Sequence, residues 1–287
     1  MKAAFDFARW TLRSVVILSA AILASALLAG SSPGTGVDER ELDARLSSGS
    51  IQSIRADHLR ERAPLLMVRA VLRDAIHGSL GTSSLYPVKI SQLLKARAAL
   101  SARYLAGGLL LAWAFAAALI FLEQSISTRL SFFPRLAAIV LLMVPSAALA
   151  AALGLLTAGA PYFCTAAVVF ARVYTVSSEI ARKGAATRHS FYALANGMRL
   201  RQRLFFSVLP EATPELLALL GLSVNIAIGA LIAVEAVCDK PGLGRLAIEA
   251  AMGRDTRVVI VLTAIICALT QLANSHRQFW IKRRQWL

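Results

Sequence analysis

Charged residues are scarce in this sequence, and acidic residues are the scarcest of them. Charged residues make up 16% of the 287 positions, and 16 Asp and Glu stand against 31 Lys and Arg, for a formal net charge of +15. Hydrophobic residues reach 57%, above the share usual in soluble domains. Strong positive charge is also typical of nucleic-acid binding, but these basic residues form no single stripe and the apolar runs are too long for a soluble fold. The composition predicts a polytopic membrane protein that contacts lipid and binds no nucleic acid.

Residues that build metal centres, disulfide frameworks and active sites are also few. The three cysteines and four histidines are scattered, without the spacing of metal ligands or of paired cysteines. The sequence has no H-E-x-x-H motif and no G-x-x-x-x-G-K-[ST] phosphate loop. We therefore expect no catalytic residues, no metal and no cofactor in this chain. Any nucleotide hydrolysis linked to its function is expected on a separate protein.

Six apolar runs approach the roughly 20 residues that a helix needs to span a bilayer. They cover residues 14–30, 104–122, 136–156, 160–176, 216–234 and 258–273. Pro145 lies inside the third run and predicts a kink, which membrane helices tolerate. The first run also has signal-peptide features, namely a basic start, a short apolar core and small residues at its end. An uncleaved span is favoured, because its removal would leave five spans.

The distribution of basic residues predicts the orientation of these spans. Most of the basic excess falls on the side that holds both termini, so both are predicted to be cytoplasmic. The expected fold is all-α with six transmembrane helices. It divides into residues 1–30, with the first helix, an external segment 31–103, and a five-helix core 104–287 with a cytoplasmic loop over 177–214. Apolar spacing over 60–76 predicts an amphipathic helix in the external segment, packed on the bundle or on the membrane surface.

The cytoplasmic loop contains the segment FYALANGMRLRQRLFFSVLP at positions 191–210. Gly197 lies thirteen residues before Pro210, and a glycine allows a turn that a side chain would oppose. Two short helices broken at this glycine would project a knob from the membrane. Arg199, with Arg201 and Arg203, would then meet either an acidic rim on a soluble partner or anionic lipid head groups.

Two further segments have an informative spacing of glycine, proline and charge. The first reads EAVCDKPGLGRL from Glu235 to Leu246 and continues as AIEAAMGRD to Asp255. Its Pro-Gly-x-Gly is a tight turn, which either packs two helices together or contacts a docked partner. The second reads GSLGTS from Gly78 to Ser83 and is followed by Pro87 and Val88.

These three segments resemble the permease subunits of binding-protein-dependent ABC importers. The loop is similar to the family's EAA, three residues, glycine, nine residues, then Ile/Val-x-Leu-Pro, although Phe191 and Tyr192 stand where the family has Glu and Ala. An alternative register uses Glu179, Ala181 and Gly184. The resemblance places the ATPase-coupling loop at Ala193, Ala195, Gly197, Arg199, Leu209 and Pro210. It places the external turn at Pro241, Gly242, Gly244 and Arg245.

The external segments are similar to those of dipeptide, oligopeptide and nickel permeases, of the kind that provides the first of two permease subunits. The resemblance implies the type I importer fold, a bacterial inner membrane, a second permease subunit, two ABC ATPase subunits and an external solute-binding protein. It leaves open whether the solute is a peptide, nickel or another small molecule, and whether the two permeases are identical.

Two polar residues in or beside the fifth span are assigned to the translocation path. Asn225 shares a helix face with Gly221, Gly229 and Ala233, and small residues at this spacing also favour close helix packing. An intramembrane polar residue is the usual marker of a path. Glu235, at the outer end of the span, is expected to be either a gate ion pair or a cap exposed to water.

Two other functions fit parts of the sequence. The replacement of the family's glutamate by Phe191 favours a membrane scaffold that keeps the permease fold without transport. An ion-coupled secondary transporter is disfavoured, because proton relays need acidic residues and few lie inside the spans.

Overall fold

A computed structural model of the chain describes residues 2–30, 64–125 and 132–284. The first four residues of the predicted amphipathic helix over 60–76 lie outside this described part. Within it the chain is almost entirely helical, and the only extended pairing described is an isolated bridge between Thr82 and Lys89. The prediction of an all-α fold is confirmed.

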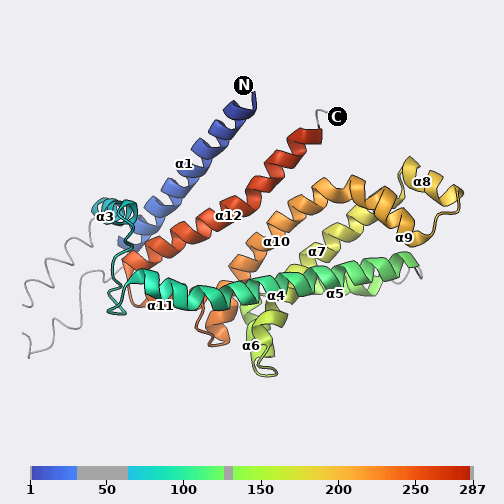
Figure 1. Ribbon diagram of the computed structural model, residues 1–287. Helices are drawn as coiled ribbons and strands as arrows, with labels where there is room; N and C mark the ends of the chain where they lie inside the picture. The colour runs from blue at the N-terminus through green and yellow to red at the C-terminus, as the bar shows by residue number, and fades with distance from the viewer. Residues whose placement is uncertain (1, 31–63, 126–131, 285–287) are drawn as a thin grey trace, which may run out of the picture. The chain divides into compact units, whose positions relative to one another are not determined.

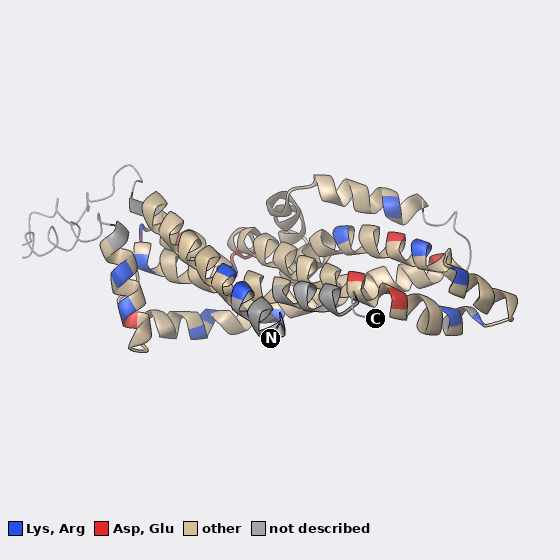
Figure 2. Cartoon of the chain, turned by 90° about the horizontal axis from the view of Figure 1, so that it is seen from above, with Lys and Arg blue, Asp and Glu red and all other residues tan. Residues whose placement is uncertain are grey.

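Five helices in the described part are long and apolar enough to cross a membrane. They are α1 (Lys2–Gly30), α4 (Ile90–Ser125), α7 (Ala160–Ala185), α10 (Leu209–Val237) and α12 (Thr256–Arg284). Figure 1 shows these as the longest ribbons, and Figure 2 shows that few charged residues interrupt them. The α4 helix begins well before the predicted span at residue 104. Its N-terminal turns carry Lys95, Arg97 and Arg103, which kept the beginning of the helix out of the apolar run.

The predicted third span is a bent pair of helices. The α5 helix (Phe132–Met143) and the α6 helix (Ser146–Gly154) meet at an angle of 103°, and together they pass the same test for a membrane span. Pro145 stands directly before α6 with φ −60, so its ring and missing N–H interrupt the helix at the predicted place. Counting this pair as one span gives the predicted six. Its bend fits either a broken span or a re-entrant segment.

The chain divides into two compact units, which are described separately. The first comprises residues 1–98 and 246–269, and the second comprises residues 99–245 and 270–287. In the first unit α3 (Pro64–Ile76) contacts α1. Met67 and Val71 lie one helical turn apart on α3 and are buried, whereas Arg69 and Arg73 are exposed. The helix therefore buries one apolar stripe, as its spacing requires.

The core of the second unit is formed by α4, α5, α7 and α10. Its buried members are Ala112, Ala116, Ala138, Val169, Phe170, Val173, Tyr174, Leu219 and Ala227. Small residues bring these helices close together, since a Cβ on Gly108 of α4 would lie 2.7 Å from the side chain of Thr165 on α7. Such close approach of backbones is what stabilises helix pairs in lipid, where apolar burial drives little association.

Candidate functional site

The segment between α7 and α10 is formed by two short helices joined at a glycine. The first, α8 (Arg188–Ala195), is followed by Gly197 at φ +70, and the second, α9, covers Leu200–Arg203. The N–H of Met198 donates to the carbonyl of Ala193 and the N–H of Gly197 donates to the carbonyl of Leu194, each at 3.0 Å. This pair of bonds is a Schellman motif, which puts one residue in left-handed backbone that glycine adopts without strain.

Both ends of this loop are fixed to the long helices of the second unit. Thr187 caps α8, because its Oγ1 accepts a hydrogen bond from the N–H of Ser190 and donates one to the carbonyl of Gly184. A five-residue π-helix (Leu204–Val208) leads from α9 into α10. A Cβ on Gly184 would lie 2.7 Å from Cγ1 of Val208, so α7 and the π-helix touch at this point. Gly184 therefore packs in the last turn of α7, whereas the left-handed glycine of the loop is Gly197.

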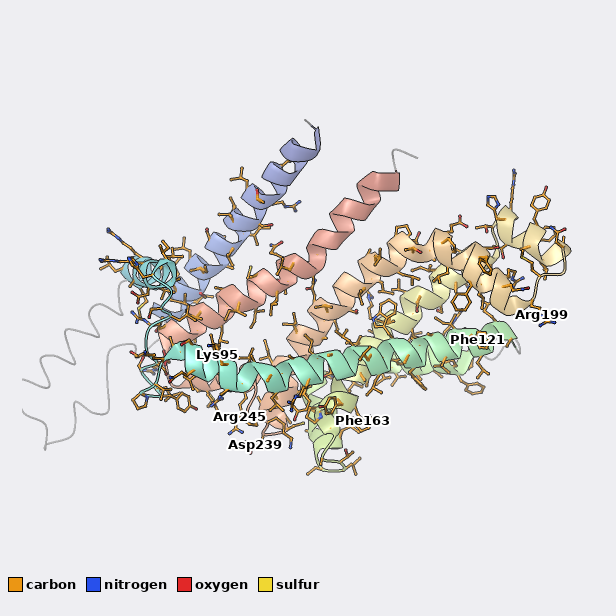
Figure 3. All side chains as sticks on the ribbon, viewed as in Figure 1. Lys95, Phe121, Phe163, Arg199, Asp239 and Arg245 are labelled. Carbon is orange, nitrogen blue, oxygen red and sulfur yellow. The ribbon has the colours of Figure 1, made fainter. Side chains whose placement is uncertain are left out.

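The exposed surface of α8 is aromatic at the positions where the family motif begins. Phe191 is 70% exposed and Tyr192 is 68% exposed, and Leu194 beside them is also exposed. Ala193 is buried on the opposite side. Among the other predicted loop residues, Ala195 and Arg199 are exposed, and Arg199 lies where the chain turns from α8 to α9 (Figure 3). Leu209 and Pro210 are exposed and lie in the first turn of α10, directly after the π-helix.

Glu235 lies at the other end of α10 and caps a helix that sequence reasoning did not predict. This helix, α11 (Leu243–Met252), begins within the predicted external turn. The buried carboxylate of Glu235 accepts hydrogen bonds from the Ser101 hydroxyl at 2.6 Å and from the N–H of Gly244 at 2.7 Å. The Ser101 hydroxyl also accepts a bond from the N–H of Leu243 at 2.7 Å. These side chains satisfy the free N–H groups at the start of α11, where a negative charge is favoured.

The prediction that Glu235 is a cap exposed to water is wrong, because its side chain is fully buried. Its described partners are hydroxyl and N–H groups, so the geometry is that of a structural anchor rather than of a gate ion pair. A Cβ on Gly242 would overlap the carboxylate, and one on Gly244 would lie 2.5 Å from the backbone of Ile232. The two glycines of the Pro-Gly-x-Gly turn are therefore required by close approach.

The other two residues assigned to this turn lie toward its surface. Pro241 is exposed, and Arg245 forms an ion pair with Asp239 at 2.6 Å. Figure 3 labels both members of this pair. Such an exposed pair contributes little stability. The described contacts of the turn join α4 to α10 through Ser101 and Glu235. The role of Ser101 could not be predicted from the sequence, where it is only a hydroxyl residue near an apolar run.

In the first unit, Asp255 joins two motifs that are distant in the sequence. Its buried Oδ2 accepts hydrogen bonds from the Ser83 hydroxyl at 2.5 Å and from the N–H groups of Ser84 at 2.9 Å and Leu85 at 3.2 Å. Its Oδ1 accepts a bond from the N–H of Val258 at 3.1 Å and thereby caps α12. The end of the GSLGTS segment and the Arg-Asp that closes the PGLGRL segment are thus one structural feature.

A second contact in the same unit supports this junction. Glu249 of α11 accepts a hydrogen bond from the Tyr86 hydroxyl at 2.8 Å and pairs with Arg97 of α4 at 2.7 Å, while Arg97 also lies 5.4 Å from the centre of the Tyr86 ring. The sequence analysis identified both motifs but did not predict that they contact each other. An acid followed by threonine and an apolar run is a helix-start signal that indicates the cap at Asp255.

Asn225 takes part in a polar pair between α10 and α12 of the second unit. Its Nδ2 donates to Oδ1 of Asn274 at 3.0 Å, and its own Oδ1 is buried without a hydrogen-bond partner in the described structure. One turn earlier, a Cβ on Gly221 would collide with the carbonyl of Ala273, whereas Gly229 faces open space. The small-residue face therefore packs closely at Gly221 and becomes polar at Asn225.

Sequence reasoning missed a second buried polar pair. Tyr174 of α7 donates a hydrogen bond to Glu123 near the C-terminal end of α4, and both side chains are buried. Glu123 directly follows an apolar run, so its position indicated the end of a span. The position did not indicate the hydrogen bond with Tyr174.

The long apolar helices and the glycine-broken loop between two of them define a multi-pass membrane protein. Residues 108–283 match the family described as binding-protein-dependent transport system inner membrane component. Since this match covers more than half of the chain, the chain belongs to that family, the permeases of ABC importers. No curated protein matches the chain.

Proposed function

We propose that this chain is the permease subunit of a bacterial ATP-driven importer that admits a small, peptide-like solute. It pairs with a second permease subunit in the inner membrane, receives its solute from an external binding protein and depends on two separate ATPase subunits. The observation that carries the proposal is the cytoplasmic loop, in which the Schellman turn at Gly197 holds α8 and α9 as a compact projection.

The attachment of the loop explains how it transmits movement. The bonds of Thr187 to Gly184 and the contact of Gly184 with Val208 tie the base of α8 to α7 and to the π-helix that starts α10. A displacement of α8 by a closing ATPase pair therefore moves two packed membrane helices with it. ATP binding biases two states of the bundle by its differential affinity for them.

The exposed aromatic face of α8 specifies the chemistry of its ATPase partner. With Phe191 and Tyr192 in place of Glu and Ala, the face offers apolar surface where the family motif offers a carboxylate. Aromatic side chains bury up to about 150–250 Å² each, and burial stabilises by about 25 cal/mol per Å². We infer that the partner's groove is apolar, with an acidic rim that meets the basic residues of the loop.

Isolation of the tagged chain from its native host tests this assignment. After mild solubilisation, mass spectrometry is expected to identify a second permease and an ATPase among the co-purified proteins. The double variant Phe191→Ala/Tyr192→Ala should lose the ATPase and keep the second permease. Phe132→Ala/Phe133→Ala is the matched control, because this adjacent aromatic pair on α5 is 64% and 71% exposed.

Equal ATPase recovery from both double variants would contradict the proposed docking face. Recovery of the chain alone, under conditions that preserve a known transporter, would overturn the importer function. The scaffold function would then follow from the loss of the family's glutamate at Phe191.

The Asn225–Asn274 pair is the part of the second unit that best supports a polar path. Asn225→Ala is expected to lower binding-protein-stimulated ATPase activity of the purified complex about tenfold, equivalent to about 1.4 kcal/mol in the barrier. A membrane hydrogen bond contributes only about 0.6–1.7 kcal/mol, so insertion and subunit recovery should persist. Gly229→Ala, one turn further along α10 and facing open space, should leave the activity unchanged. Loss of subunit recovery with Asn225→Ala would instead assign the residue to packing.

A further inference from the structure

Two cysteines that lie far apart in the sequence meet against one turn of α6 in the second unit. The Cys164 thiol lies 3.7 Å from the carbonyl oxygen of Leu149, and the Cys238 thiol lies 3.7 Å from that of Ala150. These two carbonyls are consecutive, and Cys238 packs against the apolar cluster that contains Cys164. The sequence predicted no disulfide, because the spacing of the cysteines does not show that the start of α7 and the end of α10 converge.

The surroundings hold both thiols in place. Cys164 is fully buried in an apolar cluster with Ala150, Ala160 and Val234, and Cys238 packs against the same cluster. A Cβ on Gly154 would lie 3.6 Å from the sulfur of Cys238, which shows how closely α6 approaches it. The third cysteine, Cys267, lies on α12 and is assigned to the other unit.

The thiols lie at the helix ends that face away from the cytoplasmic loop. That loop joins the end of α7 to the start of α10, whereas Cys164 lies in the first turns of α7 and Cys238 directly follows α10. Under the orientation of the proposed function, on which this step rests, these ends face the outside of the membrane. Disulfides form and persist in such oxidising surroundings.

We propose that Cys164 and Cys238 are an oxidisable pair that closes to an intramolecular disulfide on the external side. The reaction is thiol–disulfide exchange: one thiolate attacks the disulfide of an oxidant, and the second thiolate then displaces the oxidant's remaining sulfur. Both cysteines lose their protons, two electrons pass to the oxidant, and the oxidant leaves as two thiols. The disulfide ties the start of α7 to the end of α10 beside the bent α5–α6 pair.

The environment of Cys238 sets the rate of this exchange. Desolvation raises the pKa of the Cys238 thiol above its ordinary value. The positive charge of Lys240 and hydrogen bonding with the Cys164 thiol favour the thiolate, but their effect on the pKa is smaller. Because the thiolate is the nucleophile, less of it is present at neutral pH than for a free cysteine. The exchange should therefore accelerate as the pH rises toward the raised pKa.

The test uses the full chain in sealed, right-side-out membrane vesicles, with Cys267→Ser as the background so that only the pair remains. Vesicles are treated with oxidised glutathione, denatured in detergent with N-ethylmaleimide and digested. Mass spectrometry should then find a peptide that joins Cys164 to Cys238. Both cysteines should lose their maleimide adducts together and recover them after treatment with dithiothreitol.

Two matched variants in the same background identify the pair. Cys164→Ser should leave Cys238 as a glutathione adduct or a free thiol, and Cys238→Ser should leave Cys164 unreacted in its buried position. The proposal is overturned by separate glutathione adducts on both cysteines, by a link between two chains, or by a reaction that requires the oxidant inside the vesicles. None of these readouts uses transport or ATPase recovery, so the pair and the importer function can fail independently.

Discussion

Asp255→Ala is expected to lower the free energy of unfolding by about 2–4 kcal/mol. The carboxylate accepts four hydrogen bonds, and the variant removes them all. Water can reach the exposed backbone at Ser84 and Leu85, whereas Ser83 and Val258 are buried and would keep unsatisfied donors. Each such buried donor costs about 1–3 kcal/mol, so two of them are enough to account for the expected loss.

Denaturant unfolding of the purified chain in mixed micelles measures this loss. Asp255→Asn should fall between wild type and Asp255→Ala, because its amide oxygen can replace only one carboxylate oxygen and its NH₂ group would face a donor. Asp239→Asn is the control, since Asp239 is exposed, forms a surface ion pair with Arg245 and has φ +55, a backbone region that asparagine tolerates. It should change the stability by less than about 1 kcal/mol. A similar loss from both aspartates would show that the Ser83–Asp255 junction is not formed.

The membrane helices were predictable because their signal is local. A run of about 20 apolar residues indicates a span whatever its neighbours do, and Pro145 interrupts its helix through its own ring. The angle of 103° at Pro145 was not predictable, since it depends on the packing of α6 against α7 and α10. The turn at Gly197 was likewise suggested by a single residue type at a definite distance from Pro210.

The polar junctions escaped prediction because they are formed between distant segments. Ser83 and Asp255 are separated by 172 positions, and Ser101 and Glu235 by 134. Each carboxylate lies next to the start of a helix, which suggests a cap. The sequence does not show which distant residue binds to it. The same limit applies to Cys164 and Cys238, whose meeting depends on where α7 begins and α10 ends.

The loops on the two predicted sides of the membrane differ in what holds them and in what they expose. On the side predicted to be external, buried carboxylates cap α11 and α12, and each fixes a glycine-containing loop by charge and hydrogen bonds. The loop between α7 and α10, on the side predicted to be cytoplasmic, has the opposite character, because its aromatic residues are exposed and only its base is anchored. An anchored base and an exposed face are what a coupling element needs to bind a partner and still move the helices behind it.

Gly197→Val is expected to weaken docking of the ATPase without preventing membrane insertion. The Schellman turn requires φ +70 at this position, and left-handed backbone costs an ordinary residue about 1–2 kcal/mol, more when it is β-branched. Nothing lies within 4 Å of the added Cβ, so the effect is on the backbone turn and not on packing. A penalty of this size on the docking conformation lowers ATPase affinity about tenfold or more, measured as the ATPase recovered per tagged chain.

Gly78→Val is the matched control for this experiment. Gly78 also has a positive φ, at +75, and also faces open space, but it belongs to the segment predicted to be external. It should carry a similar backbone strain and retain the ATPase. Gly197→Asn should recover part of the binding, because asparagine enters the left-handed region more readily than valine. If Gly78→Val releases the ATPase as fully as Gly197→Val does, the loss reflects general destabilisation. If only the Gly197 variant does so, and asparagine restores part of the binding, the geometry of the turn between α8 and α9 is what the ATPase recognises.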